Sequence, residues 1–329
     1  MRLKTLGARR SVLAGLALLL GLAGPALATD FPNKPVRILT PFPAGSGPET
    51  VLRLLAEKLQ RRWGKPVIVE NRPGANGFIA IDAFKRGATD GTDLIQLDNV
   101  HLVAYPHLFR KLPYDPARDF EPVAPLFRTY FFVAVGAASP YKTVGDILAD
   151  AKAHPGELNY GSWSVGNPVH LGSALLEAMS GTQMQHVVYK ETSLLYAGVA
   201  SGELRWALGS LATAGPLQRA GKLRFIAVTA PQRHPAFPDL PTVAESRGPA
   251  GYEVTGWTTI AAPKQLPKAV ADKINADIAA ALAEPDIKDR YAALGYEPFP
   301  TTRERFHAFI ASESAKYADV IQRAKVALD

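Results

Sequence analysis

The sequence predicts an α/β protein in which two units of alternating strands and helices lie on either side of a cleft. Short β-rich runs and amphipathic helical patterns follow one another through most of the chain, which favours parallel sheets covered by helices. A second series begins after a long strand-like stretch at 130–135, so we expect two lobes joined by extended segments. The length of 329 residues suits two domains, and 47% hydrophobic with 20% charged side chains is ordinary globular composition.

The first unit is expected to alternate regularly between strand and helix. Its helix around 51–59 carries apolar residues at three- and four-residue spacing, the pattern of a helix with one buried face. The expected elements, in chain order, are a strand at 36–40, that helix, a strand at 67–69, a helix near 77–86 and a strand at 94–97.

The second unit repeats this alternation, and the chain then ends in helices. The expected elements are the strand-like stretch at 130–135, a helix at 144–153, a strand at 158–160, a helix at 168–179, and strands at 186–188, 204–207 and 223–228. Two apolar stripes, at 270–282 and 306–321, predict the closing helices. A capping box formed by Thr301 and Glu304 is expected to begin the second of them.

The N-terminus has the three-part pattern of a secretory signal peptide. Residues 1–10 hold four basic and no acidic side chains, an apolar run covers 12–22, and the small-residue site Ala26-Leu27-Ala28 predicts cleavage after Ala28. A membrane anchor is disfavoured because the apolar run is shorter than the ~20 residues that a span needs. The pair Arg9-Arg10 leaves both general secretion and twin-arginine export open.

Removing this leader changes the charge of the protein. The whole chain has a net charge of +7, whereas residues 29–329 hold 33 basic and 30 acidic side chains, a net charge of +3. No basic stripe remains, so a nucleic-acid partner is excluded, and a periplasmic protein is expected. The absence of cysteine from the sequence excludes disulfides, thiolate zinc sites and thiol catalysis.

Three loops between a strand and a helix share one design. They are 41–48, with Gly45, Ser46 and Gly47 before Pro48; 72–77, with Asn76 where a helix N-cap belongs; and 161–168, with Asn167 before Pro168. Glycine permits close approach of a ligand, and free N–H groups at a helix start favour an anion. Such loops gather at the carboxyl ends of parallel strands, so three of them predict a site for a small anion, although each alone is also typical of a well-capped helix.

Catalytic motifs are missing at the same places. The first loop has no phosphate-binding lysine, and 161–166 does not have the glycine spacing of a nucleophile elbow. The seven histidines include no pair at metal-ligand helical spacing. His186 is interpreted as a hydrogen-bonded strand residue, whereas His170, in a first helical turn, is an equally good candidate for ligand contact. No catalytic residue, metal or cofactor is predicted.

The order of the motifs resembles the Bug family, the extracytoplasmic solute receptors of tripartite tricarboxylate transporters. The resemblance covers the mature chain almost end to end. Its motifs are 35–37 leading to Pro41-Phe42-Pro43-Ala44-Gly45, Val69-Glu70-Asn71-Arg72-Pro73-Gly74-Ala75, Leu112-Pro113-Tyr114-Asp115, 168–171, Tyr189-Lys190, Pro238-Asp239-Leu240-Pro241-Thr242-Val243-Ala244-Glu245, and Gly251-Tyr252-Glu253-Val254 with Trp257.

The resemblance implies a type II periplasmic-binding-protein fold, with two lobes joined by crossover strands. Residues 29–128 with 230–329 would form the first lobe and 129–229 the second. The protein would act as a monomer that captures a small carboxylate-bearing molecule (a dicarboxylate, an amino acid or an aromatic acid) for membrane permease subunits. The residues expected to contact this ligand are Phe42, Pro43, Ala44, Gly45, Ser46, Glu49, Gly74, Asn76, Gly77, Asp98, Asn99, Ser162, Trp163, Asn167, His170 and Tyr189.

Several positions depart from the family pattern. Glu49 replaces an aspartate, Asp98-Asn99 replaces small hydroxyl residues, Glu191 replaces a glycine, and Trp163 is bulky in a loop that is otherwise small. An acid in the cleft would repel a plain dicarboxylate and favour a ligand with an amino group or few charges. The same acids also suit a helix first turn or a solvated loop, so the departures bear on the ligand and not on the fold.

Three functions are compatible with these features. The first is a periplasmic receptor that delivers its solute to a permease, and the second is a ligand sensor of the same fold that acts on a signalling partner. The third, a secreted hydrolase, is disfavoured because no nucleophile–base pair is visible. A turnover assay separates the third, and a partner pull-down separates the first two.

Overall fold

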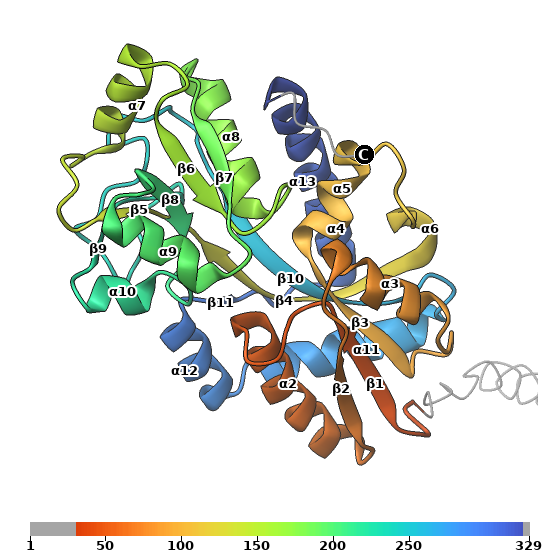
Figure 1. Cartoon of the computed structure of the whole chain (residues 1–329). Helices are drawn as coiled ribbons and strands as arrows, with labels where there is room; N and C mark the ends of the chain where they lie inside the picture. The colour runs from red at the N-terminus through yellow and green to blue at the C-terminus, as the bar shows by residue number, and fades with distance from the viewer. Residues whose placement is uncertain (1–30, 325–329) are drawn as a thin grey trace, which may run out of the picture. The chain divides into compact units, whose positions relative to one another are not determined.

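Two mixed β-sheets organise the computed structural model, which describes residues 31–324 (Figure 1). The predicted leader at 1–28 and its cleavage site lie outside the described residues. Among the residues described, no helix is long and apolar enough to cross a membrane.

The first sheet has six strands in the order β11-β4-β10-β3-β1-β2. Its strands β1, β2 and β3 are parallel, whereas β10 runs antiparallel to both β3 and β4. The strands are β1 (Val36–Thr40), β2 (Val67–Asn71), β3 (Asp93–Asp98), β4 (Phe120–Tyr130), β10 (Thr255–Pro263) and β11 (Glu297–Pro298).

The second sheet has five strands in the order β7-β6-β8-β5-β9. Strand β6 is parallel to β7 and β8, and β5 is antiparallel to β8 and β9. The strands are β5 (Phe132–Gly136), β6 (Asn159–Ser162), β7 (Gln185–Val188), β8 (Trp206–Gly209) and β9 (Leu223–Val228).

The two-lobed α/β architecture is confirmed, and the expected parallel sheets are in fact mixed, with parallel and antiparallel neighbours. Parallel neighbours need a helical crossover between them, which β1, β2 and β3 have. Strands β5 and β10 instead enter their sheets directly from the other lobe and pair antiparallel there, and β4, which leads out of the first sheet to β5, pairs antiparallel with β10.

The helices predicted from the sequence correspond to α2, α3, α7, α8, α11 and α13, whereas the remaining helices were not predicted. The predicted helix at 144–153 is α7, begun by a capping box of Thr143 and Asp146. Helix α13 begins at Arg303. The hydroxyl of Thr302 caps it by accepting from the Arg305 N–H at 3.3 Å. The prediction that Thr301 provides this cap was therefore wrong by one residue. The helices are α2 (Gly47–Trp63), the 3₁₀ turn η1 (Ala75–Gly77), α3 (Phe78–Lys85), α4 (Asn99–Val103), α5 (Tyr105–Leu108), α6 (Pro116–Asp119), α7 (Val144–Ala153), α8 (Pro168–Ser180), α9 (Thr192–Ser201), α10 (Gly215–Arg219), α11 (Lys268–Leu282), α12 (Pro285–Leu294) and α13 (Arg303–Ala324).

The chain passes between the lobes twice, and one threonine joins the two passages. The single strand expected at 130–135 is instead two strands in different sheets, separated at Phe131. Thr229, fully buried at the end of β9, accepts from Phe131 N–H at 2.9 Å and donates to Val254 C=O at 2.7 Å through its hydroxyl. Its backbone N–H and C=O bond the same two residues. The predicted domain boundaries at 128–129 and 229–230 stay a prediction.

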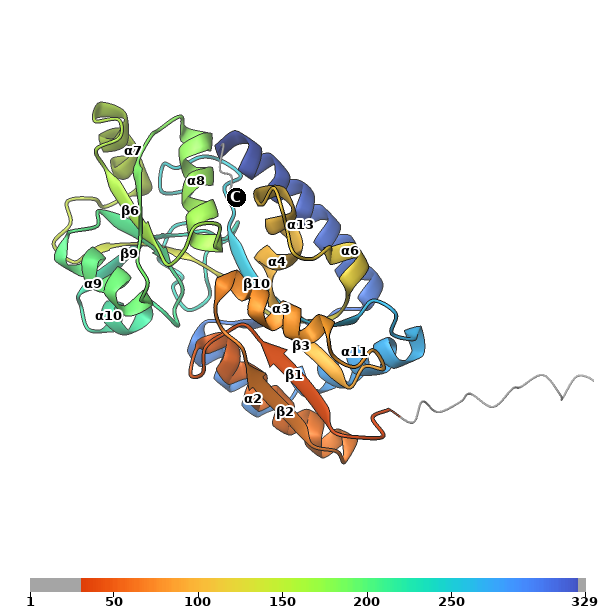
Figure 2. The same ribbon diagram turned by 45° about the vertical axis from the view of Figure 1, so that its right-hand side comes forward.

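Helix α13 packs against both lobes. Figure 2 shows it running from the first sheet toward α8 of the second lobe. Trp257 of β10, almost fully buried, meets Phe306 and Phe309 of α13 edge to face at 5.6 and 5.5 Å between ring centroids. Farther along the helix, Val320 belongs to the apolar core of the second lobe.

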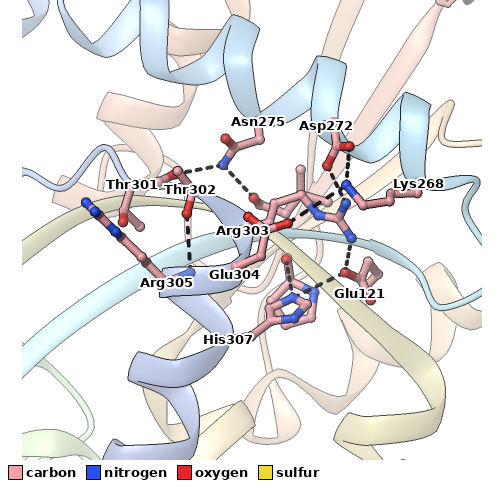
Figure 3. A network of polar contacts seen from close by, with 12 residues as sticks. Glu121, Lys268, Asp272, Asn275, Thr301, Thr302, Arg303, Glu304, Arg305 and His307 are labelled. Atoms are coloured by element: carbon pink, nitrogen blue, oxygen red, sulfur yellow. Dashed lines mark hydrogen bonds and ion pairs between the residues drawn. The ribbon is translucent and has the colours of Figure 1, made fainter.

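A buried ionic network fastens the start of α13 to the first sheet (Figure 3). The carboxylate of Glu121 on β4, 6% exposed, accepts hydrogen bonds from Lys264 at 3.0 Å and from Arg303, and His307 lies 3.2 Å away. Arg303 also binds Asp272 of α11 at 2.6 Å. Burial alone raises the pKa of Glu121, but hydrogen bonds from Arg303 and Lys264 outweigh it, so the pKa is lowered and the group is ionised. Three elements are thereby held to one carboxylate.

The Thr229 clamp makes a direct prediction about stability. Thr229→Val keeps the side-chain shape but leaves one buried N–H and one buried C=O without partners, each at a cost of about 1–3 kcal/mol. We expect the free energy of unfolding to fall by about 2–4 kcal/mol in urea titration. Thr89→Val, at an exposed turn, should change it by no more than about 0.5 kcal/mol. Equal effects of the two substitutions would contradict a structural role for the hydroxyl.

Candidate functional site

A cavity of about 580 Å³ lies between the two sheets. From the first lobe it is lined by the loop before α2, the end of β3, the second half of β4 and the start of β10. From the second lobe it is lined by the loops before α8 and α9 and by the loop after β8. A ligand inside it therefore touches both lobes at once.

A second cavity of about 240 Å³ adjoins the first. It lies among the loop before α2, the 73–77 loop, helix α4 and the loop before α8. The two cavities meet at five residues that line both of them: Phe42, Pro43, Asp98, Trp163 and Pro168.

Helices α2, α8 and α9 begin at these cavities. Ser46 is the N-cap residue of α2, but its hydroxyl makes no capping bond and is buried without a hydrogen-bond partner. Asn167 caps α8 as predicted, with Oδ1 accepting from His170 N–H at 2.8 Å. The start of α9 adds Thr192 and Ser193 to the wall of the larger cavity. Helix N-termini carry partial positive charge and favour carboxylates.

The first loop is held in place by a buried acid. Glu49, 2% exposed, accepts from Gly45 N–H at 3.0 Å and forms an ion pair with Arg53. Asn71 completes the support by donating its amide to Phe42 C=O at 3.0 Å. Glu49 therefore shapes the loop from behind and lines neither cavity.

The second loop does not use its asparagine as expected. Asn76 lies inside the 3₁₀ turn with φ of 53°, and Gly77 is the residue before α3, so the prediction that Asn76 caps this helix was wrong. The carbonyl of Asn76 instead meets Nε2 of His101 at 3.0 Å. Gly77 has φ of 85°, and a Cβ there would lie 2.3 Å from the same nitrogen, so only glycine fits. Gly74, Asn76 and Gly77 all line the smaller cavity.

Asp98 occupies the last position of β3, where the two cavities meet. Its carboxylate accepts from the Val100 N–H at 3.3 Å and caps the short helix α4, while its own N–H donates to the His101 imidazole at 3.1 Å. Burial raises the pKa of Asp98 to about 7, against a smaller lowering by backbone N–H groups. Thr258 of β10 lies directly opposite Asp98 in the sheet register.

The other predicted contact residues lie outside the cavity walls. Asn99 is fully buried and donates to the Tyr317 hydroxyl at 2.9 Å, Ser162 donates to Ser164 C=O at 2.9 Å, and Tyr189 donates to Glu203 at 2.8 Å. Ala44 and His170 are also absent from both walls, whereas Phe42, Pro43, Gly45, Ser46, Asp98, Trp163 and Asn167 line at least one of them. Which of these contact the ligand stays a prediction.

Several cavity residues had no local motif to reveal them. Thr129, Thr258 and Tyr296 come from crossover strands or the chain's last third, and Ser210 and Thr213 follow β8. Lys190, in the Tyr189-Lys190-Glu191 segment, had the one usable sequence signal, because it precedes a helix after a strand.

A stacked pair of histidines supports the loop before α8. The rings of His170 and His186 lie 3.9 Å apart between centroids, and Tyr160 stacks on His186 at 5.3 Å. His186 Nε2 meets the Ser162 hydroxyl at 2.7 Å, and His170 Nδ1 accepts from Gly166 N–H at 3.0 Å. Burial, and for His170 also the neighbouring ring, lowers the pKa values to about 3 for His170 and about 4 for His186. Within residues 31–324 no group of three or more His, Asp or Glu side chains is placed to hold a metal ion.

Two lobes around a cavity rich in helix N-termini define the class of two-lobed solute-binding proteins. Residues 51–326 match the family described as tripartite tricarboxylate transporter family receptor (TctC), and the chain belongs to that family. This confirms the resemblance to Bug receptors, and the protein is therefore a solute-binding receptor and not an enzyme.

Three known proteins illustrate the similarity. BugT of Bordetella pertussis (strain Tohama I) is 28% identical over 303 residues, covering 92% of this chain and 93% of BugT. The structure described as R. palustris Rpa4515 with adipate has 29% identity and a TM-score of 0.82, covering 90% of this chain and 99% of that one. MatC (Rpa3494) from Rhodopseudomonas palustris with bound malate has 28% identity and a TM-score of 0.77, covering 88% and 100%.

The stacked histidines predict a pH dependence of stability. Their pKa values are lowered in the folded protein, so the unfolded chain, with histidine near 6.5, binds protons first as the pH falls. We expect the stabilising contribution of these two histidines to be complete above pH 6.5 and to be lost progressively between pH 6.5 and about 4. In NMR titration the rings of His170 and His186 should stay neutral at pH 5, whereas exposed His154, whose pKa is raised chiefly by its hydrogen bond to Asp150, should be protonated there. Ordinary titration of His170 and His186 near pH 6.5 would contradict the packing described.

Proposed function

We propose that this receptor captures a small organic acid in the periplasm and delivers it to the permease subunits of a tripartite tricarboxylate transporter. The observation that carries the proposal is the arrangement at the 580 Å³ cavity, where α2, α8 and α9 begin and the Ser46 hydroxyl has no partner. A ligand carboxylate placed there would accept hydrogen bonds from backbone N–H groups and that hydroxyl.

The structural neighbours support this ligand class. Rpa4515 is described with adipate and MatC with malate, both of them small dicarboxylates. The matched region of this chain supplies the same kind of two-lobed fold. From these two proteins we infer only that the ligand of this chain carries a carboxylate. The rest of the ligand is not inferred from them, because Asp98 lines the cavity of this chain and would interact with it.

Export is part of the proposal and has its own test. The charged start, apolar run and Ala26-Leu27-Ala28 site predict removal of residues 1–28 during secretion. N-terminal sequencing of protein recovered from the periplasmic fraction should therefore find a chain that begins at or near Thr29. Recovery of the protein there with Met1 still in place would contradict the predicted cleavage.

Carboxylate capture predicts stabilisation by ligand and a specific effect of Ser46→Ala. A thermal-shift panel of dicarboxylates, amino acids and aromatic acids should contain hits, because a ligand at a hundredfold excess over its Kd adds about 2.7 kcal/mol to the folded state. For such a hit, Ser46→Ala should weaken binding about tenfold to a hundredfold in calorimetry, since a hydrogen bond to a charged group is worth about 1.5–3 kcal/mol.

The design of that variant separates binding from folding. The Ser46 hydroxyl makes no capping bond, so its removal should barely change the melting temperature of the free protein. Ser312→Ala on α13, whose hydroxyl bonds Phe309 C=O away from the cavity, is the matched control and should bind normally. A folded protein that responds to no compound of the panel would defeat the proposal.

A further inference from the structure

The cavity wall contains one carboxylate that no cation of the protein neutralises. In the described part of the chain, the side chain of Asp98 is bonded to backbone N–H groups at the start of α4 and forms no ion pair. This differs from Glu121, a more deeply buried carboxylate that is bonded by Arg303 and Lys264. A partly desolvated acid without a cationic partner costs free energy that an incoming cation would recover.

The groups packed around Asp98 are all neutral near pH 7. His101 of α4 has its pKa lowered to about 4 by burial, so its ring carries no charge. The phenols of Tyr105, Tyr296 and Tyr317 have raised pKa values, chiefly through burial and in part through the charge of Asp98 itself. Lys190 is the one Lys or Arg side chain in the two cavity walls, and it lies in the other lobe, exposed and without a bonded acid in the described structure.

A second polar group beside Asp98 also lacks a partner. Thr258, its cross-strand neighbour on β10, is 3% exposed and lines the larger cavity. Its hydroxyl oxygen is buried without any hydrogen bond. Acceptor positions on Asp98 and Thr258 are therefore left open side by side, as a site for a hydrogen-bond donor requires.

A large part of the remaining wall is aromatic. Rings from both lobes and from both crossover segments line the larger cavity: Phe42, Phe127, Phe131, Trp163, Trp257 and Tyr296. Such a surface suits an apolar body and, through the ring faces, a cationic nitrogen.

We infer that Asp98 selects a ligand that carries a protonated amine as well as a carboxylate, namely an amino acid or a longer amino carboxylate with an apolar body. The inference rests on the proposed function, which supplies the carboxylate end at Ser46 and the helix starts. The ammonium group pairs with Asp98 and donates to Thr258. A plain dicarboxylate would instead bring a second negative charge to an acid in a poorly solvated wall, where repulsion is strong.

Matched ligands and an isosteric variant test this selection. Calorimetry compares 6-aminohexanoate with adipate, glutamate with glutarate, and phenylalanine with 3-phenylpropionate, on wild type and Asp98→Asn. Asparagine is as good a helix cap as aspartate, so the variant should fold and keep α4. Asp239→Asn, which removes the same charge from an exposed loop, is the control.

We expect at least one amine-bearing member to bind wild type tenfold or more tightly than its partner without the amine. Asp98→Asn should weaken the binding of that ligand at least tenfold, while its amine-free partner should bind equally well or more tightly. Asp239→Asn should change the affinity for neither ligand.

The inference is overturned if amine-free acids bind best to wild type and Asp98→Asn does not weaken the binding of any ligand. It is also overturned if acids bind more tightly at low pH and Asp98→Asn removes this dependence, because Asp98 would then act as a protonated donor. In both cases the receptor still binds carboxylates, whereas silence of all six compounds and of the wider panel would defeat the proposed function itself.

Discussion

The double passage of the chain between two sheets is the constraint on which the rest of the molecule depends. At this point Thr229 bonds both Phe131 and Val254 through its backbone and its hydroxyl, so the two connecting segments are fixed to each other. Because buried backbone groups must be hydrogen-bonded, the connection has little freedom to change its pairing. Strands β4 and β10 continue this pairing over most of their length in the first sheet. Each lobe can thus have its own core while the loops at its strand ends face those of the other.

This arrangement explains why the cavity is built from sequence-distant parts. The start of α2 comes from one lobe and the starts of α8 and α9 from the other, and the crossover strands supply the wall between them. Helix α13 then packs against α8 as well as the first sheet, and it places Tyr317 on the buried Asn99. Anion-favouring helix ends therefore converge by topology, without any basic residue being required to attract the ligand.

The electrostatics of the protein separate structural acids from the acid of the cavity. Glu121 is surrounded by Lys264, Arg303 and His307, and its lowered pKa reflects this closed network. Glu49 is likewise satisfied by Arg53 and by the backbone of its own loop. Asp98, in contrast to Glu121, has a raised pKa, because burial is offset only by backbone N–H groups. A carboxylate that lies at a cavity without a cationic partner points to a role in binding the ligand.

Local sequence determined much of this protein. The strand at 36–40, the helix at 144–153 with its capping box, and the Asn167 cap before α8 all follow from spacing and side-chain chemistry within a few residues. The order of loop motifs also pointed to the receptor family that the comparisons established. Tertiary structure alone decided that the stretch at 130–135 divides between two sheets, that Asn99 is buried against Tyr317, and that Thr258 lies opposite Asp98. These outcomes depend on contacts between residues far apart in the chain, whose free energy is absent from any local window of sequence. The cavity wall is made mostly of such contacts, which is why the sequence identified the loops but only the fold showed which of their side chains face the space between the lobes.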